Sequence, residues 1–85
     1  MKVSIYGLGY IGLPTAAVIA SRKINVLGID INKKIVSNIN QGKTHIKEKN
    51  LSRVLRNAVE KKFLFASLKP GEADVHIIAV PTPIK

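Results

Sequence analysis

A glycine-rich hexapeptide near the start of the chain constrains the fold more than any other feature. It reads Gly7-Leu8-Gly9-Tyr10-Ile11-Gly12, follows an apolar run over residues 2–6 that predicts a strand, and precedes a predicted helix. The next apolar run, 26–29, ends at Asp30. The pattern G-x-G-x-x-G is weak by itself. With a strand before it, a helix after it and an acid after the next strand, it predicts a βαβ unit with a nucleotide site.

Each glycine of the motif has its own physical role. Gly7 permits the tight turn, Gly9 lets a pyrophosphate approach the backbone, and Gly12 lets the helix pack closely on the strand. The start of the helix adds N–H donors and a partial positive charge, which suit phosphates. Asp30 can accept hydrogen bonds from both hydroxyls of adenosine ribose, and it repels a 2′-phosphate. The sequence therefore predicts a dinucleotide site that favours NAD over NADP.

Strands and helices alternate along the rest of the chain. We expect strands over 2–6, 26–29, 63–66 and 75–80, and helices over 11–22, between Asn32 and Gly42, and over 51–59. The apolar run 75–80 predicts that the fourth strand is buried. Apolar strands separated by helices indicate a parallel α/β sheet, and right-handed crossovers give the strand order 3-2-1-4. This is a Rossmann-type sheet, truncated after its fourth strand.

Composition bounds the chemistry. The chain has 85 residues, room for one small domain, and no cysteine, which excludes disulfides and thiol chemistry. Its net charge is +9, and nine Lys and Arg lie between residues 33 and 62 against Glu48 and Glu60. No aromatic interleaving accompanies them, so a solvated surface is favoured over a nucleic-acid face. With no signal-peptide layout and no membrane-length apolar stretch, a cytoplasmic location is expected.

A few polar residues outside the glycine loop are candidate site residues. Thr82 follows the fourth strand, where ligands of open α/β sheets bind, although a simple strand terminator explains it equally well. His76 lies within that strand without a partner at metal-ligand spacing, so we expect a core or edge histidine. His45 and Glu48 lie in a polar loop with no nucleophile to activate. No catalytic or metal-ligating residue is predicted.

Residues 7–17 closely resemble the opening of the UDP-glucose/GDP-mannose dehydrogenase family, especially its UDP-N-acetyl-D-mannosamine dehydrogenase branch. The likeness continues through 28–32, 39–42 and 45–46. It ends at 78–83, Ile-Ala-Val-Pro-Thr-Pro, which is similar to the family's signature at the end of the fourth strand. The resemblance covers essentially the whole chain, with the motifs in the expected order and spacing.

This resemblance implies an oxidoreductase that converts the C6 alcohol of a UDP-sugar to a carboxylate with two NAD. It implies NAD contacts at Tyr10, Ile11, Asp30 and Thr82, and a catalytic cysteine, lysine and asparagine in later domains. Family members run to several hundred residues. We therefore expect residues 1–85 to be the N-terminal part of a Rossmann NAD-binding domain, without catalytic and UDP-sugar domains and inactive alone. The parent is expected to be a homodimer and the isolated chain to self-associate.

Two alternatives stay open at this point. A β-hydroxyacid dehydrogenase would share the glycine loop and the acid, but not the run 10–17 or Pro81-Thr82-Pro83. A non-catalytic module that binds nucleotides or other anions would account for the positive charge.

Overall fold

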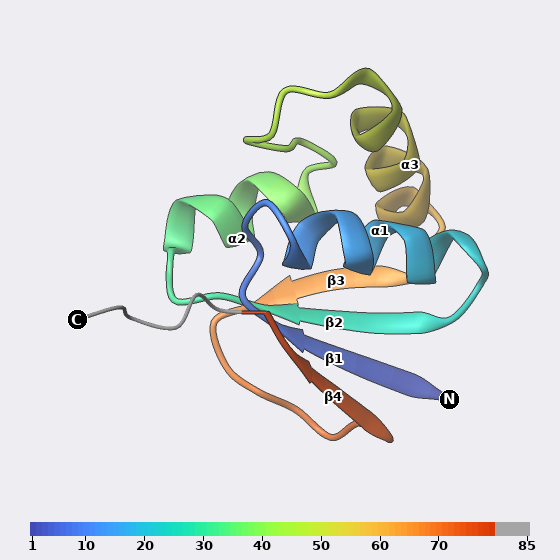
Figure 1. Cartoon of the computed structure of the whole chain (residues 1–85), viewed down its shortest axis with the longest axis vertical. Helices are drawn as coiled ribbons and strands as arrows, with labels where there is room; N and C mark the ends of the chain where they lie inside the picture. Colours follow the sequence, from blue (N-terminus) through green and yellow to red (C-terminus); the bar gives the residue numbers. More distant parts are fainter. Residues whose placement is uncertain (80–85) are drawn as a thin grey trace.

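A computed structural model describes residues 1–79 of the chain. Within this range the elements are β1 (Lys2–Tyr6), α1 (Gly12–Ser21), β2 (Asn25–Ile29), α2 (Lys33–Asn40), α3 (Lys49–Glu60), β3 (Leu64–Ser67) and β4 (Val75–Ile78). The strands form one sheet in the order β3-β2-β1-β4, and every pair is parallel (Figure 1). The predicted fold class and strand order are confirmed.

The ends of α2 follow the predicted signals. The side chain of Asn32 accepts hydrogen bonds from the backbone N–H groups of Lys34 and Ile35, at 3.0 and 3.2 Å, which caps the first turn. Gly42 lies just beyond the last turn with a φ of +77°, a left-handed conformation that glycine adopts without strain. The helix therefore stops where the sequence predicts.

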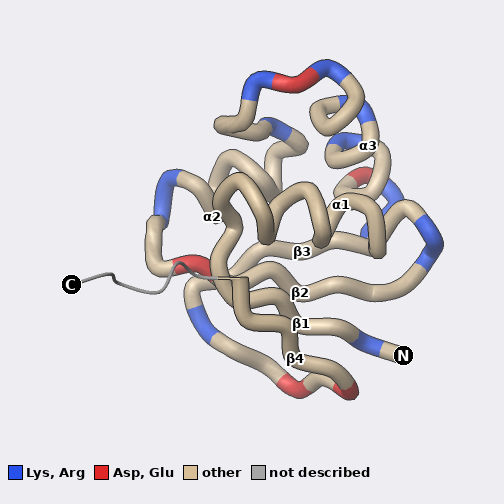
Figure 2. The backbone as a smooth tube through the Cα atoms, in the orientation of Figure 1, with Lys and Arg blue, Asp and Glu red and all other residues tan. Residues whose placement is uncertain are grey.

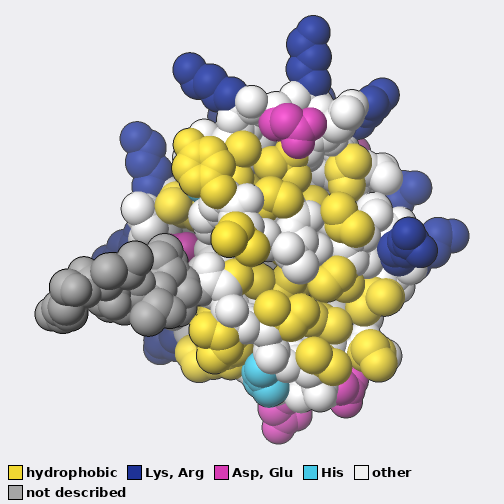
Figure 3. Space-filling model, viewed as in Figure 1, with side chains coloured by type: hydrophobic (Ala, Val, Ile, Leu, Met, Phe, Trp, Pro, Cys, Tyr) yellow, Lys and Arg dark blue, Asp and Glu magenta, His cyan; other side chains and the backbone are white. Residues whose placement is uncertain are grey.

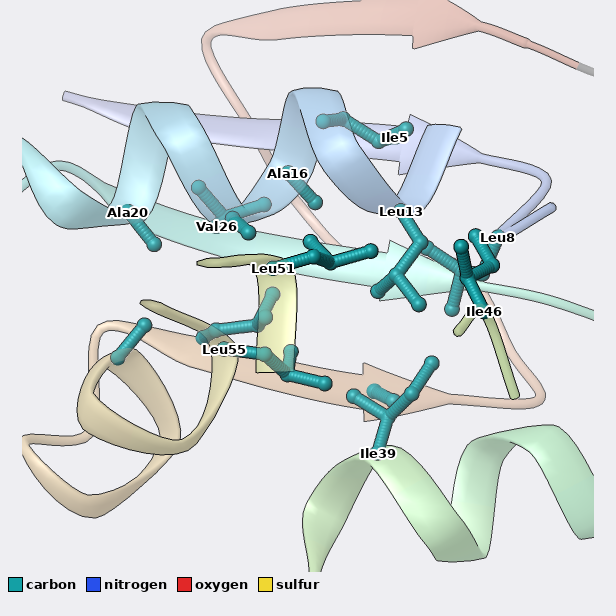
Figure 4. Packing of buried hydrophobic residues seen from close by; sticks show 14 of the residues in the cluster. Ile5, Leu8, Leu13, Ala16, Ala20, Val26, Ile39, Ile46, Leu51 and Leu55 are labelled. Atoms are coloured by element: carbon teal, nitrogen blue, oxygen red, sulfur yellow. The ribbon is translucent and has the colours of Figure 1, made fainter. Parts of the chain in front are cut away.

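The hydrophobic core lies between the helices and one face of the sheet. Alternate strand residues point into it, since Val3, Val26 and Leu64 pair in register and all belong to the buried cluster. Leu13 of α1 and Leu55 of α3 have no exposed surface (Figure 4). Three small residues, all buried, let α1 lie close to the sheet: Ala16, Ala17 and Ala20.

The opposite face of the sheet carries no helix within residues 1–79. The helices gather above the strands, and the loop from β3 to β4 passes below them (Figure 1). This loop covers part of the second face, because a Cβ built on Gly71 would lie 3.0 Å from Cδ2 of Leu27. Phe65, which pairs with Leu27, stays exposed on the same face.

The prediction of a buried fourth strand is wrong. Val75 is 39% exposed and Ile78 70% exposed. Among the described residues β4 pairs only with β1, so it forms an edge of the sheet, and no helix packs on its second face. An apolar run of this length indicates a strand but does not report which neighbours cover it. Val80, the end of the predicted strand, lies outside the described residues.

Charge is distributed unevenly over the fold. The nine basic residues between 33 and 62 belong to the helical side of the molecule, whereas Glu72 and Asp74 lie in the β3–β4 loop (Figure 2). In Figure 3 the Lys and Arg side chains project from the rim, and hydrophobic side chains occupy the middle. None of the helices within residues 1–79 has the length and apolar character needed to cross a membrane.

Candidate functional site

The glycine loop joins β1 to α1 at the carboxyl end of the sheet. Gly7 has a φ of +99°, which turns the chain sharply after β1, and its N–H donates to the carbonyl oxygen of Ile29 at 2.7 Å. The loop is thereby fixed to the end of β2 before α1 begins at Gly12. The predicted role of Gly7 in a tight turn is confirmed.

Gly12 is required by packing. A Cβ built at this position would overlap the carbonyl oxygen of Gly7 and approach the Cβ of Ala79 to 3.3 Å. No rotamer change removes such an overlap, because the obstacle is backbone. Gly12 was expected to let the helix pack closely on the strand, and the close approach is seen at Gly7, the residue that directly follows β1.

Gly9 differs from both of these glycines. Its φ is not positive, and a Cβ built on it would meet no other atom within 4 Å. Neither backbone strain nor packing within the protein requires glycine here. The open side of Gly9 leaves room for a group from outside the protein to approach the backbone, as predicted for a pyrophosphate.

The start of α1 is electrostatically suited to an anion. Ile11 occupies the N-cap position without a side-chain hydrogen bond to the helix, and the first turn contains no acidic residue. The first N–H groups of a helix lack intrahelical acceptors and carry a partial positive charge. Tyr10 and Ile11 are both exposed beside them. This end of α1 can therefore hold a negatively charged group.

Asp30 follows β2 directly and lies next to the glycine loop. Its Oδ2 accepts a hydrogen bond from the N–H of Leu8 at 2.8 Å, and its Oδ1 accepts one from the N–H of Asn32 at 2.9 Å. The carboxylate is half-buried, so part of it still faces solvent. The acid and the glycine loop, predicted from widely separated positions, are thus in direct contact.

The contact between Asp30 and Leu8 was not foreseen from the sequence. The bond to Asn32 has a local signal, because an aspartate commonly accepts from the N–H two residues later. The bond to Leu8 depends on β1 and β2 pairing in the observed register, in which Tyr6 lies opposite Ile29. Only the βαβ pattern as a whole could have suggested it.

The remaining candidates lie away from this loop or beyond the described residues. Thr82 is outside residues 1–79. His76 is exposed on the edge strand β4, which agrees with the expectation of a core or edge histidine. Its Nδ1 lies 3.1 Å from the hydroxyl oxygen of Tyr6. His45 and Glu48 are exposed and lie in the segment before α3. Within the described part of the chain, no three His, Cys, Asp or Glu side chains gather to hold a metal ion.

Comparison with known proteins identifies the family. The model of the UDP-glucose/GDP-mannose dehydrogenase family, NAD binding domain, matches residues 1–85. UDP-N-acetyl-D-mannosamine dehydrogenases of Campylobacter jejuni and Escherichia coli (strain K12) are each 57% identical to the chain, over 84 and 83 residues. Those matches cover 99% and 98% of this chain but only 21% and 20% of the relatives. The chain therefore spans about a fifth of their length.

Solved structures agree with the sequence matches. The UDP-N-acetyl-mannosamine dehydrogenase of Staphylococcus aureus superposes with a TM-score of 0.93 at 41% identity, over 98% of this chain and 20% of that one. A GDP-mannose dehydrogenase ternary complex from Pseudomonas aeruginosa gives 0.94 at 34% identity, over 100% and 20%. The predicted cofactor class, NAD, agrees with the matched domain, and a β-hydroxyacid dehydrogenase is set aside. The chain belongs to the UDP-glucose/GDP-mannose dehydrogenase family.

Proposed function

We propose that this chain binds NAD at the carboxyl end of its sheet. The start of α1 and the open side of Gly9 would hold the pyrophosphate, and Asp30 would accept hydrogen bonds from the adenosine ribose. Gly7 and Gly12 shape the loop beneath it. Three further contacts, at Tyr10, Ile11 and Thr82, belong to the proposal through the family resemblance.

The contact between Asp30 and the glycine loop is the strongest support for this proposal. Asp30 is hydrogen-bonded to Leu8, the residue immediately before Gly9. The carboxylate suited to ribose and the backbone suited to pyrophosphate therefore lie side by side, as a dinucleotide requires. A glycine turn that served only the fold would not need the open side of Gly9.

In a protein of the relatives' length, we propose that residues 1–85 form the N-terminal part of the NAD-binding domain. The whole protein would be a UDP-N-acetyl-D-mannosamine dehydrogenase that oxidises the C6 alcohol to a carboxylate, as its relatives' names and the family resemblance suggest. The cofactor, when bound, would supply the hydride acceptor for this oxidation. The residues described here bind and orient the cofactor. Because this chain contains no cysteine, the covalent chemistry implied by the family would need residues that it does not contain.

Cofactor choice tests the assignment of Asp30. We expect the chain to bind NAD more tightly than NADP, because the carboxylate repels a 2′-phosphate. Asp30→Ala should weaken NAD binding about tenfold to a hundredfold, the loss expected for a charged hydrogen-bond acceptor, and should hardly change NADP binding. Titrations followed by ¹⁵N chemical shifts of Gly9 and Gly12 measure both affinities and locate the site.

Two results would contradict the proposal. Equal wild-type affinities for NAD and NADP would show that Asp30 does not face the ribose. Shifts confined to α3, with its Lys and Arg, and absent from the glycine loop would show that the dinucleotide binds only through surface charge.

A further inference from the structure

We infer that Asp30 also positions the glycine loop for phosphate binding, in addition to accepting hydrogen bonds from ribose. This inference rests on the proposed function and extends it to the part of the ligand that Asp30 does not touch. Asp30 acts here through Leu8, so it is a positioning residue for the pyrophosphate.

Leu8 is anchored through both its backbone and its side chain. Its N–H donates to Oδ2 of Asp30 at 2.8 Å, a length typical of a bond to an ionised acceptor. Its side chain is fully buried, and its methyl groups occupy the space where Gly28 of β2 lacks a Cβ, since a built Cβ would lie 2.8 Å from Cδ2 of Leu8. Backbone and side chain of Leu8 are thus both fixed to β2. Its position relative to the rest of the core is visible in Figure 4.

The position of Gly9 depends on the residues on either side of it. It follows Leu8 directly, and its carbonyl oxygen accepts a hydrogen bond from the N–H of Leu13 at 3.1 Å. Gly9 is therefore held on one side by the Asp30–Leu8 bond and on the other by the first turn leading into α1. If Leu8 could not donate to Asp30, its buried side chain would still hold it in the core. The hydrogen bond that fixes the plane of the Gly7–Leu8 peptide would be lost.

Asp30 can position the loop and bind ribose at the same time. Each carboxylate oxygen has two acceptor positions, and each uses one of them here, for the N–H groups of Leu8 and Asn32. A second position on each oxygen is left for the ribose hydroxyls. Loop positioning and ribose recognition therefore do not compete.

Inorganic pyrophosphate separates the two roles because it has no ribose. If Asp30 only recognised ribose, Asp30→Ala would leave pyrophosphate affinity unchanged or raise it, since a nearby negative charge is removed. If Asp30 positions the loop, the same substitution lowers that affinity. The two explanations thus differ in the sign of the effect.

Asp74→Ala is a matched control. Oδ2 of Asp74 also accepts a backbone N–H, that of Lys2, at 2.8 Å. This bond lies at the amino end of the sheet, away from the glycine loop. The control therefore removes the same charge and the same kind of hydrogen bond without touching the proposed site.

The experiment is a ¹⁵N NMR titration of the wild type and both variants with pyrophosphate at constant ionic strength. Shifts of the folded-state signals report affinity independently of how much protein is unfolded. We expect Asp30→Ala to weaken pyrophosphate binding about threefold to tenfold, as the loss of one charge-assisted bond to the loop implies. Asp74→Ala should not weaken it. Asp30→Asn, which keeps one acceptor oxygen, should fall between the wild type and Asp30→Ala.

Amide exchange at Leu8 provides a readout that needs no ligand. We expect exchange at this amide to be at least tenfold faster in Asp30→Ala, relative to amides in the centre of β1, than in the wild type. Equal relative rates would overturn the inference. So would unchanged or tighter pyrophosphate binding in Asp30→Ala, or a wild type that binds NAD but not pyrophosphate. A wild type that binds neither ligand would instead refute the proposed function.

Discussion

At the scale of single residues, the three positions of the loop are all glycine, but each for a different physical reason. Gly7 is needed for its positive φ and Gly12 for the absence of a Cβ against a carbonyl oxygen. Gly9 has neither a positive φ nor a neighbouring atom that a Cβ would meet. Alanine at Gly9 should therefore affect ligand binding, whereas alanine at Gly12 should affect folding.

We predict that Gly9→Ala leaves stability unchanged or raises it slightly, by up to about 1 kcal/mol, because its backbone conformation suits alanine. The same substitution should weaken NAD binding about tenfold or more, since the methyl group occupies the ligand's side of the loop. Gly12→Ala should prevent folding or destabilise the chain by more than about 4 kcal/mol. Thermal unfolding and NAD titration measure both effects. A Gly9→Ala variant that unfolds, or one that binds NAD normally, would contradict this explanation.

Much of the site at this scale follows from sequence spacing. The turn at Gly7, the packing at Gly12 and the place of Asp30 after β2 all come from one pattern whose physical reasons are local. The Asp30–Leu8 bond does not, because it joins residues 22 positions apart and requires the register of the sheet. Local patterns predict which residue types meet, and tertiary pairing decides which atoms bond.

At the scale of elements, α2 protects an edge of the sheet. The side-chain amide of Asn40 donates to the carbonyl oxygen of Ala66 and accepts from its N–H, both at 2.8 Å. Ala66 belongs to β3, which has β2 as its only strand neighbour among the described residues. The amide therefore satisfies backbone groups that an edge strand would otherwise offer to another chain.

We predict that Asn40→Ala lowers the free energy of unfolding by about 1–3 kcal/mol, because two half-buried hydrogen bonds are lost. Asn40→Asp should cost at least as much, since a carboxylate cannot donate to the carbonyl oxygen and would repel it. Asn57→Ala on the exposed face of α3 is the control and should change stability by less than about 0.5 kcal/mol. Urea unfolding measures all three variants, and equal stabilities of wild type and Asn40→Ala would refute the role of this pair.

The positions of the helices and strands were largely predictable from the sequence, but the segments that cover them were not. Asn32 and Gly42 set the ends of α2 through capping and a left-handed turn, both of which depend on residue type alone. Burial of β4 was predicted wrongly because its apolar composition suits a strand covered on both faces. What covers a strand depends on segments elsewhere in the chain. Asn40 gave no signal for the same reason.

At the scale of the whole molecule, the second face of the sheet is covered at its centre, where Ser4 and Leu27 are buried, and stays open at its two edges within residues 1–79. Phe65 is 61% exposed on this face and Ile78, which extends it at the other edge, 70%. In a doubly wound sheet both faces are covered by helices. Exposed apolar side chains beside an open strand edge favour association between copies of the chain.

We therefore predict that the isolated chain self-associates at physiological salt, where repulsion from its +9 charge is screened beyond about 8 Å. Ile78→Lys and Phe65→Lys should each shift it toward monomer. Val18→Lys, on the outside of α1 and 57% exposed, is the control and should not. Sedimentation velocity over a range of concentrations decides the matter. A wild type that is monomeric throughout would show that the exposed apolar side chains at the edges of this face are tolerated in water.

The central position of β1 has a consequence for the order in which the fold forms. Lys2 pairs with Asn25 across one crossover, whereas Val3 pairs with Val75, 72 residues later. Closing the longer segment costs only about 1 kcal/mol more chain entropy than closing the shorter one, because this cost grows with the logarithm of length. Distant pairing is nevertheless slow, since little holds it until most of the intervening chain is ordered. Because β2 lies closer to β1 along the chain than β4 does, we expect β4, whose end lies beside the glycine loop, to join the sheet after β1 and β2 have paired.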